Sequence, residues 1–78
     1  MREKIEKMID YLESEIEFHE KRANAMVNEL RECAAKYDTY SLVTFLPSKI
    51  EGVKYEVDMV REMREQKRML VHFLKEDG

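Results

Sequence analysis

Apolar or small residues recur through the first 37 positions at alternating intervals of three and four. This is the heptad rhythm, which keeps one residue per turn on the same face of an α-helix. Neither Gly nor Pro interrupts the stretch, so the pattern predicts one long helix over about residues 2–37. The positions are Ile5, Ile9, Leu12, Ile16, His19, Ala23, Met26, Leu30, Cys33 and Tyr37.

A second helix is predicted over about residues 48–75. Ser48 stands three residues before Glu51, which is the capping-box spacing of a helix start, and Pro47 directly precedes it. Apolar residues then follow the heptad rhythm, although Arg64 and Lys67 take two of its positions. The apolar members are Ile50, Val53, Val57, Val60, Val71 and Leu74.

The segment 38–47 between the two helices has mixed signals. Its β-branched and aromatic residues favour a strand, whereas Asp38 is a residue type that caps a helical turn. A single short strand has no partner within this chain. We therefore expect an apolar connector containing a short helical turn, and the alternative is a strand exchanged between two copies in a dimer.

Charged residues form one acidic and one basic row at heptad spacing. The acidic row is Glu6, Glu13 and Glu20, and the basic row is Lys54, Arg61, Arg68 and Lys75. The two rows match only if the chain folds back on itself, with Glu6 near Lys75, Glu13 near Arg68 and Glu20 near Arg61. The sequence thus predicts an all-α, coiled-coil-like antiparallel two-helix hairpin. An extended pair of helices that bundles only with another chain is the alternative.

More apolar residues are present than one seam between two helices can cover. Exposed together, they would form a large apolar patch of the kind that marks an interaction site. We expect self-association into a homodimeric four-helix bundle, or coverage by a partner protein. The candidate interface residues are Tyr11, Phe18, Met59, Met63, Leu70 and Phe73.

Composition narrows the function classes. The 78 residues are enough for a single domain, residues 1–78, and their apolar content of 44% argues against disorder. No run approaches the ~20 apolar residues of a membrane span. The single cysteine excludes an internal disulfide framework and a multi-cysteine zinc site, and it favours a reducing, cytoplasmic location.

The sequence contains no recognisable catalytic or metal-binding arrangement. His19 lies on the predicted seam with Glu15 four residues before it, but the Glu-x-x-His spacing of di-iron bundles is missing. A polar seam residue that sets the pairing of the helices is the favoured interpretation of His19. We expect no enzymatic activity, no metal and no cofactor.

Arg61, Arg64 and Arg68 belong to the densest basic cluster of the chain. Such residues can bind phosphate groups, which suggests a nucleotide or other anion held between two protomers. Glu62 and Glu65 interrupt the cluster, and the net charge of the chain is −3. Nucleic-acid binding is therefore not favoured, and anion binding stays the alternative hypothesis.

Taken as one acidic helical module without catalytic groups, the chain is similar in general form to many small regulators and inhibitors carried by phages and other mobile elements. That resemblance implies an adaptor, regulator or inhibitor that acts by contact. The first hypothesis is therefore a non-enzymatic protein that oligomerises and modulates another protein, with an acidic or methionine-rich surface as the contact.

Overall fold

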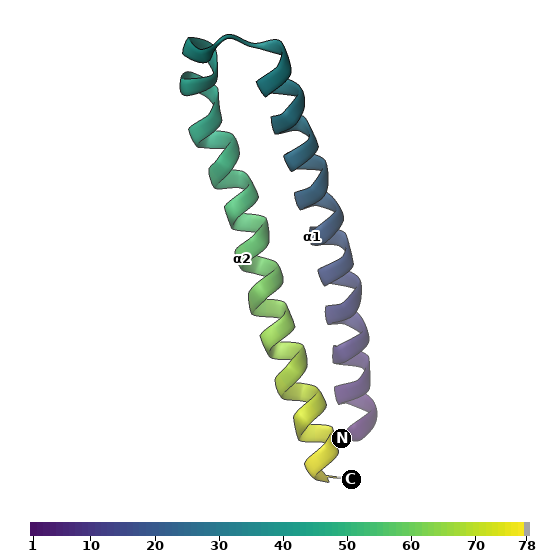
Figure 1. The fold of residues 1–78 in the computed structure, drawn as a ribbon. Coiled ribbons are helices and arrows are strands. Elements are labelled where there is room, and N and C mark those ends of the chain that lie inside the picture. Colours follow the sequence, from purple (N-terminus) through teal and green to yellow (C-terminus); the bar gives the residue numbers. More distant parts are fainter. Residues whose placement is uncertain (78) are drawn as a thin grey trace.

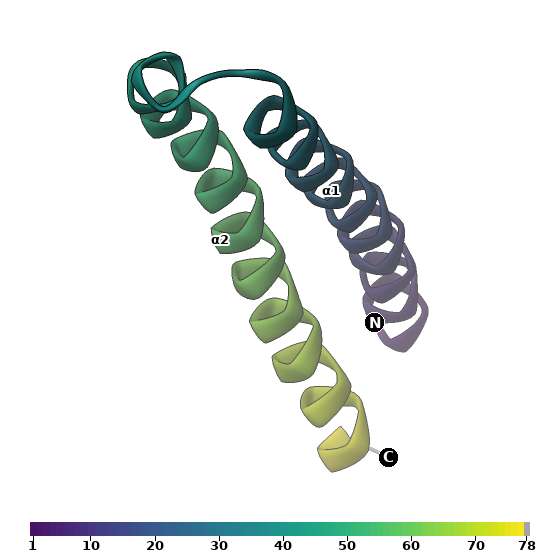
Figure 2. The same ribbon diagram turned by 45° about the horizontal axis from the view of Figure 1, so that its top comes forward.

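The computed structural model describes residues 1–77 and consists of two helices, α1 (Arg2–Lys36) and α2 (Thr39–Asp77). The helices lie side by side and run in opposite directions, so that the start of α1 and the end of α2 meet at one end of the molecule (Figures 1 and 2). The molecule measures 58 × 14 × 13 Å. The predicted all-α helical hairpin is confirmed.

The turn between the helices is much shorter than expected. Tyr37 is extended, with φ −107° and ψ 154°, and its N–H donates to the Cys33 carbonyl at 3.0 Å to close α1. Asp38 then caps α2, because its Oδ1 accepts a hydrogen bond from the Ser41 N–H at 2.8 Å. The prediction of a connector over 38–47 is therefore wrong, as is the exchanged strand, since the segment from Thr39 onward is helical.

Pro47, expected to precede the second helix, lies inside α2. Proline has no N–H, so the helix loses the hydrogen bond that residue 47 would donate to the Val43 carbonyl, at a cost of about 3 kcal/mol. The hydroxyl of Ser48 donates to the Phe45 carbonyl at 3.2 Å. Ser48 is thus an interior helical residue, and the capping box predicted from it does not start the helix.

The seam of α1 follows the predicted heptad rhythm. Ile5 and Leu12 are buried, and the later members of the series are half-buried as far as Cys33. These residues face α2 over most of the length of the hairpin, because an uninterrupted 3–4 spacing keeps them on one side of the helix.

The seam of α2 differs from the prediction at every second position. Ile50 and Val57 are 53% and 37% exposed, while Glu56 is only 4% exposed. An unbroken 4–3 series accounts for this, and every member of it is buried or half-buried. The series is Leu42, Leu46, Lys49, Val53, Glu56, Val60, Met63, Lys67, Leu70 and Leu74. Three of its members, Lys49, Glu56 and Lys67, are charged. The sequence prediction counted only apolar residues, and it therefore chose a neighbouring row of positions on α2.

Gly52 lies where the two helices approach closely. A Cβ placed on this residue would lie 2.7 Å from the terminal methyl of Met26 on α1. The absence of a side chain therefore lets α2 pack directly against the end of the Met26 side chain, which offsets part of the ~1 kcal/mol that glycine costs inside a helix.

Candidate interaction surfaces

A buried ionic cluster joins the two helices near the middle of the seam. Glu56 of α2 accepts a hydrogen bond from Nδ1 of His19 through one carboxylate oxygen, and its other oxygen lies 3.2 Å from Nε of Arg22. Glu15 lies 3.6 Å from Nε2 of the same histidine. Because Glu15, His19 and Arg22 are spaced by four and three residues, they lie on one face of α1.

The polar groups of this cluster are paired with one another. Among residues 1–77, every buried side-chain nitrogen or oxygen has a hydrogen-bond partner. No group of three or more His, Cys, Asp or Glu side chains in that range is arranged to hold a metal ion. His19 thus lies in the seam with both ring nitrogens next to carboxylates. Its main partner, Glu56, was missed by sequence reasoning, and only the 4–3 spacing from Leu42 onward would have placed it there.

The charged rows pair across the helices, but with other partners than expected. Glu13 lies 3.2 Å from Lys67 rather than near Arg68, and Glu20 bonds Arg64 rather than Arg61. The reason is that α2 is rotated, relative to the prediction, so that Glu56 faces α1. This rotation turns Arg64 and Lys67 towards α1 in place of Arg61 and Arg68. Glu6 pairs with Arg2 on its own helix rather than with Lys75. Glu29, which was not part of the predicted row, pairs with Lys49 across the helices at 3.2 Å.

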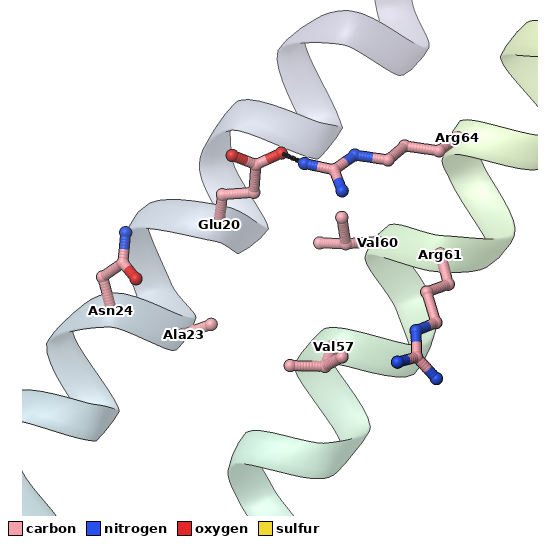
Figure 3. Close-up of a pocket in the computed structure, with 7 residues that line it drawn as sticks. All are labelled: Glu20, Ala23, Asn24, Val57, Val60, Arg61 and Arg64. Carbon is pink, nitrogen blue, oxygen red and sulfur yellow. Dashed lines mark hydrogen bonds and ion pairs between the residues drawn. The ribbon is translucent and has the colours of Figure 1, made fainter.

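A groove on one side of the hairpin contains two of the three arginines proposed for anion binding. Its volume is about 360 Å³, and Arg64 reaches across it to Glu20 (Figure 3). Arg61 also lines it, but the guanidinium groups of the two arginines point in different directions. The full lining is Glu20, Ala23, Asn24, Val57, Val60, Arg61 and Arg64.

Arg68 does not join this groove. It bonds Glu65 on its own helix, and this hydrogen bond raises the pKa of Arg68 and lowers the pKa of Glu65. The side chain lines a separate hollow together with Val71, His72 and Lys75. The three arginines therefore form no single anion site within this hairpin.

The opposite side of the hairpin carries an apolar groove of about 400 Å³ near the termini. Tyr11 and Met69 contribute to it from the two helices and are 64% and 62% exposed. The groove lies opposite the arginines because Tyr11 and Glu13 flank the buried Leu12 on its two sides. Its lining is Met8, Tyr11, Leu12, Gln66, Met69 and Leu70.

This groove is part of a longer apolar surface, which we call the aromatic face. Heptad spacing from the groove residues places further apolar side chains on the same side of each helix. The aromatic face consists of Met8, Tyr11 and Phe18 on α1 and Tyr55, Met59, Met69 and Phe73 on α2. Four of the six proposed interface residues belong to it. The other two, Met63 and Leu70, are half-buried seam residues at its base.

The interior of the hairpin is small compared with this exposed surface. Within residues 1–77, the buried apolar side chains are those of Ile5, Leu12 and Val60, and the one buried polar residue is Glu56. Large apolar side chains are exposed at positions along both helices, including Phe18 and Phe73 at 56% and 54%. The apolar surface thus lies mainly on the outside of the hairpin.

Comparison with known protein families, characterised proteins and solved structures finds no match for this chain. Within residues 1–77, neither helix is sufficiently long and apolar to cross a membrane. The functional argument therefore rests on the residues and surfaces described above.

Proposed function

We propose that this chain is a non-enzymatic, cytoplasmic interaction protein that forms a homodimeric four-helix bundle and in that form binds and modulates another protein. The observation that carries the proposal is the aromatic face, an exposed apolar surface built from both helices of a hairpin with three buried apolar residues. Small domains need an additional source of stability, and self-association is a common one.

Packing of two aromatic faces would supply the missing core. An accumulation of exposed large apolar side chains on one side of a small protein is typical of interaction sites. Burial of a large side chain such as Tyr11 or Phe73 contributes about 1.5–3 kcal/mol. Because several such side chains lie on the aromatic face of each copy, the free energy gained by association is comparable to the stability of a small domain.

Light scattering coupled to size-exclusion chromatography tests the self-association. We expect twice the chain mass of 9.4 kDa at micromolar concentration. Phe73→Lys should shift the protein to monomer, whereas Ile50→Lys should not, because Ile50 is equally exposed but lies away from the aromatic face. A fully helical monomer at these concentrations would contradict the proposal.

The surface for the modulated protein is proposed on the outer side of α1. Glu3, Asp10 and Glu17 are exposed and seven residues apart, so they form one acidic row pointing away from α2. A basic protein surface is the complementary partner. Replacing Glu3, Asp10 and Glu17 with Lys should abolish the capture of the partner protein by this chain. Changing Glu32, Glu51 and Glu65 to Lys alters the net charge equally and should leave capture intact, because these residues lie outside the acidic row and the aromatic face.

The alternative is an anion-binding protein that uses the groove of Arg61 and Arg64. Within the described residues Arg61 has no ion-pair partner, whereas Arg64 is held by Glu20. Phosphate and nucleotides should then raise the melting temperature, and Arg61→Ala should remove the effect. No stabilisation by any of these anions would contradict this alternative.

A further inference from the structure

The aromatic face has the spacing of a second helix-packing seam on α1. Its apolar residues belong to a series with alternating intervals of four and three, which is the rhythm of a side that packs against another helix. The series is Lys4, Met8, Tyr11, Glu15, Phe18 and Arg22. It differs from the seam that faces α2, so α1 carries two adjacent packing sides, as each helix of a four-helix bundle does.

The same rhythm runs along α2. The second series there starts at Tyr55 and proceeds by intervals of four and three. Its members are Tyr55, Met59, Glu62, Gln66, Met69, Phe73 and Glu76. Charged residues occupy three of the six positions of the α1 series and two of the seven positions of the α2 series. The positions of these charges distinguish one way of pairing two hairpins from another.

Contacts between the helices show which residues lie at the same height along the hairpin. Glu13 pairs with Lys67, and Tyr11 and Met69 line one groove. With the same antiparallel offset, Lys4 lies level with Glu76, and Phe18 lies level with Glu62. Arg22 therefore lies about one helical turn away from the level of Glu62. Lys4 and Glu76 are a level pair with opposite charges on the two helices.

We infer that the aromatic face binds the aromatic face of a second copy of this chain, related by a two-fold axis parallel to the helices, so that both turns lie at the same end. The inference rests on the proposed dimer and specifies its interface and orientation. Each α1 then packs against α2 of the partner, and all neighbouring helices are antiparallel.

Charge complementarity selects this orientation. Lys4 faces Glu76 of the partner subunit at the same height, and Arg22 lies about one helical turn from Glu62 of the partner subunit. Arg22 and Glu76 keep side-chain exposures of 59% and 70% beside their intramolecular partners Glu56 and His72, so they remain free to pair again. The two-fold axis generates each pair twice.

The reversed orientation brings like charges together. With a two-fold axis perpendicular to the helices, α1 packs against α1 of the partner in the opposite direction. Glu15 lies at the middle of the α1 series, between Met8 and Arg22, so it meets its own symmetry copy. Two carboxylates facing each other across an interface are repulsive.

Distances between spin labels test the orientation. Single cysteines at Thr39 and at Glu3, in a Cys33→Ala background, place one label at the turn and one at the termini. In the inferred dimer, both sites give distances on the scale of the narrow cross-section, 14 × 13 Å. In the reversed dimer, with the axis at the height of Glu15, the labels lie about 36 Å apart at Glu3 and about 70 Å apart at Thr39, from the helical rise of 1.5 Å per residue.

The spin-label distances distinguish a failure of the inferred orientation from a failure of the proposed homodimer. Long distances at both sites would overturn the orientation and leave the homodimer intact. Absence of any dipolar coupling, with a monomer mass by light scattering, would overturn both. Short distances at both sites would support both.

A charge exchange provides an independent readout. Lys4→Glu should raise the dimer dissociation constant by about twofold to thirtyfold, since it removes two exposed ion pairs per dimer. Adding Glu76→Lys should restore most of the affinity. Lys54→Glu is the control, because Lys54 lies outside the second seam of α2. Equal weakening by Lys54→Glu, or no recovery in the double variant, would contradict the inferred pairing.

Discussion

Glu56 of α2 is buried against His19 of α1, and this contact joins the two helices through a carboxylate and an imidazole near the middle of the seam. Arg22 neutralises the other carboxylate oxygen at 3.2 Å from its Nε. A buried charge is tolerated only where partners replace its hydration. The contact therefore specifies which face of α2 turns inward, since no other rotation of the helix supplies Glu56 with these two partners.

Removing one member of this pair should destabilise the hairpin strongly. Glu56→Ala leaves His19 and Arg22 without their partner, and we expect a loss of about 3–5 kcal/mol in the free energy of unfolding. Chemical denaturation followed by circular dichroism at fixed protein concentration measures it. Glu51→Ala, at an exposed position of the same helix, should change the stability by less than about 0.5 kcal/mol.

Replacing both members should cost little. His19→Leu with Glu56→Leu exchanges the ion pair for apolar contact, and such exchanges are often neutral or stabilising. A double variant as unstable as Glu56→Ala would show that the site requires polar groups for a reason other than mutual pairing.

A charge exchange at Glu20 and Arg64 tests the pairing between the helices. Glu20→Lys should destabilise the hairpin by about 0.2–1 kcal/mol, because the pair is exposed. Arg64→Glu in the same chain should recover part of the loss, whereas Arg61→Glu should recover less, because Glu20 bonds Arg64. Thermal unfolding of the wild type and the three variants decides between the two partners, and better recovery with Arg61→Glu would refute the described rotation of α2.

Pro47→Ala should stabilise the protein. Since Pro47 lies inside α2, alanine restores the donor to the Val43 carbonyl and removes the ring clash, a gain of up to about 3 kcal/mol. The unfolding midpoint should rise, and the amide hydrogen introduced at position 47 should be protected from exchange. If the helix instead began at Ser48, the midpoint would not change and this new amide would exchange freely.

Asp38 should make the stability depend on pH in the acidic range. Its hydrogen bonds with Ser41 hold the pKa of the carboxyl below its ordinary value in the folded chain. The contribution of the cap is therefore complete above the pKa of the unfolded chain, and it is lost as the pH falls through the lower folded value. Asp38→Asn keeps a capping acceptor without titrating, so the stability difference from the wild type should shrink with decreasing pH. A constant difference would contradict this assignment.

The α1 helix and its seam could be predicted from sequence because they depend on local properties. Heptad spacing without Gly or Pro specifies a long helix and the face that packs, and Ile5 and Leu12 are the buried residues on that face. Complementary charge rows were also sufficient to predict antiparallel pairing. A small rotation of either helix changes which residues pair, but acidic side chains of α1 still lie opposite basic side chains of α2.

The rotation of α2 could not be predicted in the same way. Lys49, Glu56 and Lys67 occupy inward positions, where a hydrophobicity pattern assigns no charged residue. Whether a charge can lie in a seam depends on the groups that α1 presents at the same height, here His19 and Arg22 for Glu56. The start of α2 was likewise obscured by β-branched residues and Pro47, whose local preferences were overridden by the Asp38 cap and by packing of Leu42 and Leu46.

The α1 helix, the antiparallel pairing and the surplus of apolar residues thus follow from spacing and composition, because these patterns can be recognised without knowing which face of each helix packs. The inward face of α2, the actual ion pairs and the separation of the aromatic face from the arginine groove arise only when the two helices pack. Each of these depends on the free energy of burying Glu56, which is determined by residues more than thirty positions away in the chain.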